Sequence, residues 1–77
     1  MGNGENQYTI RRRAANSIRA LMMSMPSLPE TKGQRRLLRK HGSPKAFARG
    51  CLGALGEISV DEATAAILKY RDEWLAA

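Results

Sequence analysis

Apolar side chains recur every three or four residues along most of this 77-residue sequence, and no segment alternates apolar and polar residues over the length of a strand. A spacing of three to four places side chains on one face of a helix, whereas a half-buried strand needs alternation. Valine occurs once and threonine three times, so the β-branched residues typical of sheets are scarce. The sequence therefore predicts an all-α fold, a small single domain of about four short helices with no sheet.

Proline, glycine and capping residues divide the chain into the four predicted helices. The first begins at Tyr8 or Thr9 and ends before Pro26, because proline disfavours helical geometry in the residue that precedes it. The second begins within residues 27–31, where two overlapping capping boxes compete, and ends at Gly42.

The third and fourth helices have clearer start signals. Ser43 can cap a helix that has Pro44 at its first position, and Gly56 can end that helix. Ser59 and Glu62 form a capping box for the fourth helix. An apolar seam then repeats at spacings of three and four: Val60, Ala63, Ile67, Tyr70, Trp74 and Ala77. This seam fits a core-facing stripe and equally a coiled-coil dimer interface, so both alternatives stay open.

The length of the chain allows only one hydrophobic core. Residues 1–7 are predicted to form a flexible polar tail, and residues 8–77 the helical domain. A core of this size stabilises a fold by only about 3–5 kcal/mol, so burying one more helix face would help. The sequence therefore predicts a homodimer formed through residues 58–77.

Charge is distributed very unevenly along the domain. Residues 11–49 contain eleven lysines and arginines against one acid, whereas residues 50–77 contain two cations against five acids. The domain thus divides into a basic half, residues 8–49, and a neutral-to-acidic half, residues 50–77. Concentrated positive charge opposes folding by self-repulsion unless something offsets it. The asymmetry predicts that the basic half binds a polyanion.

The second predicted helix gathers cations on one side. At 100° per residue, four of them fall within an arc of about 140°: Arg35, Arg36, Arg39 and Lys40. The opposite side carries Gln34, Leu37, Leu38 and His41. Nine of the thirteen cations in the chain are arginines, whose forked guanidinium suits phosphate and guanine. The full set of candidate binding residues is Arg35, Arg36, Arg39, Lys40, Lys32, Lys45, Arg49, Arg12 and Arg19.

Two functions fit this surface. In the first, the protein is a regulator or accessory factor that binds nucleic acid, DNA rather than RNA, through its basic helices. In the second, it is an interaction module or inhibitor that docks its cationic face on an acidic partner protein or a nucleic-acid channel, as small arginine-rich proteins of bacteriophages and mobile elements often do. A helix-turn-helix motif fits poorly, because a recognition helix at residues 60–75 would present Asp61 and Glu62 to phosphates.

The sequence offers little for catalysis. His41 is the only histidine, and no second histidine or cysteine lies at metal-ligand spacing, so we expect no metal, no cofactor and no enzyme activity. We expect His41 to cap helix carbonyls and Cys51 to be a buried structural thiol. Gly50 and Gly53 lie within one predicted helix, and we expect the close approach of another helix, rather than contact with phosphate, to explain them.

The sequence also lacks features of membrane insertion or export. No stretch approaches 18 uninterrupted apolar residues, and the polar N-terminus has no apolar signal-peptide core. We therefore expect a cytoplasmic protein that does not span a membrane.

Overall fold

The computed structural model of the protein describes residues 7–77 and contains four helices within them. These helices are α1 (Gln7–Met23), α2 (Lys32–His41), α3 (Pro44–Gly53) and α4 (Val60–Ala76). Within the described residues, the only β feature is an isolated bridge between Leu55 and Ile58, so the all-α prediction is confirmed. The predicted tail lies outside these residues except for Gln7, which already begins α1.

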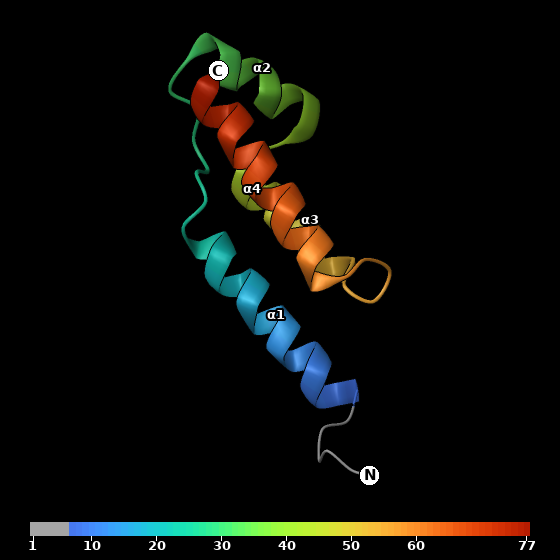
Figure 1. The fold of residues 1–77 in the computed structure, drawn as a ribbon. Coiled ribbons are helices and arrows are strands. Elements are labelled where there is room, and N and C mark those ends of the chain that lie inside the picture. The colour runs from blue at the N-terminus through green and yellow to red at the C-terminus, as the bar shows by residue number, and fades with distance from the viewer. Residues whose placement is uncertain (1–6) are drawn as a thin grey trace.

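The four helices form an elongated molecule of about 54 × 20 × 16 Å (Figure 1). Helices α3 and α4 lie side by side, α1 packs against both of them, and α2 packs against α4. Helix α2 lies across the C-terminal end of α4 at one end of the molecule, and α1 extends toward the other end. The acidic half of the sequence is therefore packed among the helices of the basic half, and the two form a single domain.

Side-chain caps set the starts of three helices. The Thr31, Ser43 and Ser59 hydroxyls each accept a hydrogen bond from the backbone N–H three residues later. Glu62 also accepts a hydrogen bond from the Ser59 backbone N–H, which completes the predicted capping box. The hydrogen bonds with Ser59 lower the pKa of the Glu62 carboxyl below its usual range, and the bond from the Ser59 backbone has the larger effect. Of the two competing boxes before α2, Thr31 provides the cap that is used.

The end of α1 agrees with the sequence prediction, whereas the end of α3 differs from it. Helix α1 ends at Met23, and Met25 is buried in the turn that follows, where its N–H donates to the Met22 carbonyl. Helix α3 ends at Gly53 instead of Gly56, which has a φ of +107° in the next turn. Apolar residues beyond both helix ends still reach the core, because a tight turn can also direct its side chains inward.

The core contains the predicted seam of α4. Ala63, Ile67, Tyr70 and Trp74 are buried, and Val60 is half-buried. Ile18, Met25, Ala48 and Cys51 are the other buried apolar residues. The seam of α4 is thus a core-facing stripe in a single chain. The homodimer was predicted to form through this apolar stripe. Within one molecule the stripe is already covered by the other helices.

Candidate nucleic-acid interface

Gln34 holds α2 against the end of α4. Its side-chain amide donates to the Trp74 carbonyl at 3.0 Å, and its carbonyl oxygen accepts from the Glu30 N–H at 2.7 Å. The side chain is buried, and both of its ends are satisfied within the protein. Gly33 makes the close approach possible, because a Cβ there would lie 3.0 Å from the Ala77 Cβ. This side of α2 is therefore fixed against the body of the domain.

Tyr70 of α4 provides the second attachment of α2 to the rest of the domain. Its hydroxyl donates to the Gly42 carbonyl at 2.6 Å, and the Leu37 carbonyl lies 3.2 Å from the same oxygen. Burial, and secondarily the charge of Glu73, raise the pKa of the Tyr70 phenol above its usual range. The hydroxyl therefore keeps the proton with which it caps the carbonyl end of α2. This hydroxyl and the Gly42 N–H, which donates to the Leu38 carbonyl, do the capping that we expected of His41.

The opposite side of α2 forms a cationic face directed to solvent. Because Gln34 is buried and Leu37 and Leu38 are half-buried, the helix orientation predicted from the sequence is confirmed. Five exposed side chains make up this cationic face: Lys32, Arg35, Arg36, Arg39 and Lys40. Helix α2 itself contains no acidic residue. The face therefore presents dense positive charge on a rigidly attached helix.

The remaining predicted cations lie elsewhere. Arg12 and Arg19 are exposed and line a hollow on α1 together with Arg11 and Ala15. The Arg19 guanidinium also donates to the Asn16 side chain at 3.4 Å. Because α1 and α2 extend toward opposite ends of the molecule (Figure 1), these cations form a second basic surface, separate from the cationic face.

Lys45 and Arg49 come from α3, one turn apart. Lys45 is half-buried in the first turn, where its backbone N–H donates to the Pro26 carbonyl, and Arg49 is exposed. The eleven cations of the basic half therefore lie on three different helices.

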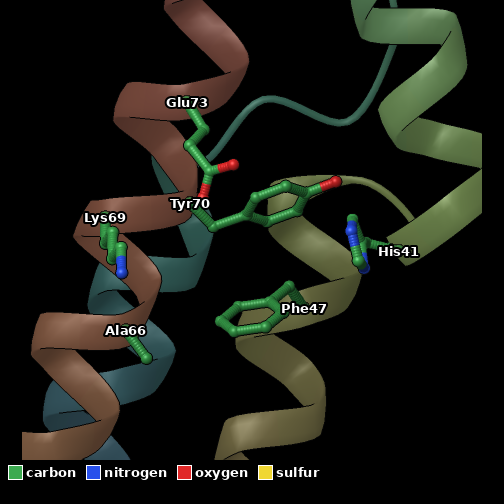
Figure 2. A pocket seen from close by; sticks show the side chains of 6 residues that line it. All are labelled: His41, Phe47, Ala66, Lys69, Tyr70 and Glu73. Carbon is green, nitrogen blue, oxygen red and sulfur yellow. The ribbon is translucent and has the colours of Figure 1, made fainter.

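An aromatic pocket lies between α2, α3 and α4, and the sequence analysis did not identify it. Its volume is about 220 Å³, and its lining residues, shown in Figure 2, are His41, Phe47, Ala66, Lys69, Tyr70 and Glu73. The Phe47 and Tyr70 ring centroids are 5.1 Å apart, and the His41 ring meets the Tyr70 ring edge-on at 5.9 Å. These residues come from three helices, so no local sequence pattern could have brought them together.

Cys51 is part of the hydrophobic core of the domain. Cys51 is buried, and this burial raises the pKa of its thiol, as expected for a structural cysteine. Among the described residues, no group of three or more histidine, cysteine, aspartate or glutamate side chains is arranged to hold a metal ion.

The glycine explanation drawn from the sequence is wrong. A Cβ at Gly50 or Gly53 would meet no atom within 4 Å, and both residues are exposed on the outer side of α3. No other helix therefore approaches them. The glycine that allows a close approach between two helices is instead Gly33 on α2, which lies against the C-terminal end of α4.

Open space at Gly50 leads to a testable prediction. We expect Gly50→Ala to raise the stability of the domain by about 0.5–1 kcal/mol, because alanine loses less backbone entropy in a helix. The melting temperature should rise by about 3–6 °C in a thermal unfolding curve followed by circular dichroism. The matched control is Gly56→Ala, which places a Cβ at a φ of +107° and should lower the melting temperature. An unchanged or lower melting temperature for Gly50→Ala would contradict the prediction.

Across the described residues, no helix has the length and apolar character needed to cross a membrane. No protein-family model, curated protein or solved structure matches this chain.

Proposed function

We propose that this protein binds nucleic acid through the cationic face of α2, as a small regulator or accessory factor without catalytic activity. The observation that carries the proposal is the exposure of all five cations of α2 while its other side is fixed to the core by Gln34 and Tyr70. Because the backbone of α2 is already fixed, only the side chains lose conformational freedom when these cations meet phosphates. Three of the five are arginines, which can contact phosphate or guanine through two hydrogen bonds.

The surrounding charge supports the same proposal. The chain has a net charge of +6, so a polyanion is attracted before any contact forms. The second basic surface on α1 and the α3 residues Lys45 and Arg49 would add electrostatic attraction for a long ligand. Nucleic acid is such a ligand, because its duplex carries one negative charge per about 1.7 Å of axis.

Electrophoretic mobility shift at several salt concentrations tests the proposal. The probes are a random single strand, a random duplex and a structured RNA of equal length. For about six phosphate contacts, the slope of log K against log salt should be near −5 on duplex and near −4 on a single strand.

Failure of all three probes to bind at 100 mM salt would overturn the proposal. The cationic face would then favour the second function, docking on an acidic partner protein, whose affinity should depend on the same arginines.

A further inference from the structure

We propose that the aromatic pocket receives an unstacked base of a single-stranded nucleic acid whose phosphates lie on the cationic face. This inference rests on the proposed function and specifies which form of nucleic acid the protein prefers. Duplex DNA keeps its bases paired and stacked, so a base can enter a pocket only after leaving the helix. A single strand offers its bases without that cost.

The walls of the pocket suit a flat aromatic ring. Tyr70 is only 5% exposed and is fixed by its hydroxyl bond to Gly42, so the accessible ring surface comes from the half-buried Phe47, which packs against it, and from His41. His41 is exposed and closes the side next to α2, as Figure 2 shows. Bases stack on aromatic side chains with little dependence on sequence, because every base has a π-face. Tyr70 and Phe47 are held in place before a ligand arrives, so base binding requires little rearrangement of these two rings.

The rim of the pocket supplies one hydrogen-bond donor and one acceptor. Lys69 and Glu73 are both exposed, and they extend from α4 in different directions (Figure 2). An ammonium can donate to a base carbonyl, and a carboxylate can accept from an exocyclic amine. Cytosine and guanine each carry both a carbonyl and an exocyclic amine, and the pocket has a volume of about 220 Å³. Cytosine, the smaller of these two bases, is therefore the one tested.

The pocket borders the cationic face. Lys40 lies at the edge of the cationic face, about 100° around α2 from His41 of the pocket wall. Glu73 also lines a neighbouring hollow together with Arg36, on the same side of the α2–α4 contact. A strand whose phosphates contact Arg36 and Lys40 would thus pass the mouth of the pocket. Phosphate contacts position the strand, and the inserted base adds affinity that depends on the base.

The test compares a 20-residue oligodeoxycytidylate with an abasic strand of the same length and with a 20-base-pair duplex. The abasic strand carries the same phosphates but has no bases, so binding by phosphate contacts alone would not distinguish the two strands. By fluorescence anisotropy of labelled probes, we expect the protein to bind oligodeoxycytidylate about tenfold more tightly than the abasic strand. The duplex should bind more weakly than the oligodeoxycytidylate.

Filling the pocket provides the matched variants. Ala66→Leu adds a side chain into the cavity without changing charge, and the affinity for oligodeoxycytidylate should fall to that for the abasic strand. Ala65→Leu is the control, because Ala65 is exposed on the same helix and does not line the pocket. It should keep the tenfold preference. His41→Ala removes an exposed ring without adding volume and should lower the preference by about fivefold.

Three results would overturn the inference. Equal affinity of the unmodified protein for the base-containing and abasic strands would show that no base is bound. Retention of the tenfold preference by both Ala66→Leu and His41→Ala, with unchanged circular dichroism, would place base binding outside this pocket. Absence of binding to every probe would overturn the proposed function, and this inference with it.

Discussion

Replacing Arg35, Arg36 and Arg39 by glutamate is expected to abolish nucleic-acid binding, with a loss of about a thousandfold or more in affinity. Each hydrogen bond to a charged group contributes about 1.5–3 kcal/mol, so removing three arginine contacts accounts for a loss of that size before repulsion is added. These side chains are exposed on the side of α2 that faces away from the core. Far-ultraviolet circular dichroism should therefore remain helical. Anisotropy with a labelled single strand measures the affinity.

The control for total charge is a triple reversal on the other basic surface, at Arg11, Arg12 and Arg19. Both triple variants lower the net charge from +6 to 0, so only the location of the change differs. We expect the variant on α1 to lose less than tenfold. Equal losses for the two variants would mean that overall charge, and not the cationic face, determines binding. Unchanged affinity after reversal on α2 would mean that the binding site lies elsewhere.

Trp74→Ala is expected to leave the chain largely unfolded at room temperature. Trp74 is only 1% exposed, and its ring meets the Tyr70 ring edge-on with centroids 6.4 Å apart. Replacing a buried tryptophan by alanine costs about 3–5 kcal/mol, because apolar contacts are lost and a cavity remains. That cost is comparable to the whole stability expected of a domain this small. In a urea titration followed by circular dichroism, the variant should show no folded baseline at low urea concentration.

Leu75→Ala is the matched control for this prediction. Leu75 follows Trp74 on the same helix but is 64% exposed, so its truncation should change the unfolding midpoint only slightly. An unchanged midpoint for Trp74→Ala would show that the α4 seam contributes far less to the core than its burial implies.

Helix starts and helix faces were predictable from the sequence because both depend on neighbours within about one turn. Ser43, Ser59 and Glu62 act on backbone groups three residues away, so their capping role could be read directly. The division of α2 into a cationic side and a side containing Gln34 follows from helix geometry alone. The end of α3 was less predictable, because residues after Gly53 enter the core from a turn.

The sequence by itself determined that the chain is all-α, that the cations of α2 share one face, and that the α4 seam is an apolar stripe. Only the tertiary structure decided that this seam is covered by the other helices of the same chain. Tertiary packing also placed the cations of α1 on a separate surface, left Gly50 open to solvent, and brought His41, Phe47 and Tyr70 together. The physical reason is that periodicity specifies which side of a helix is apolar, whereas the choice of partner for that side depends on contacts between residues distant in the sequence.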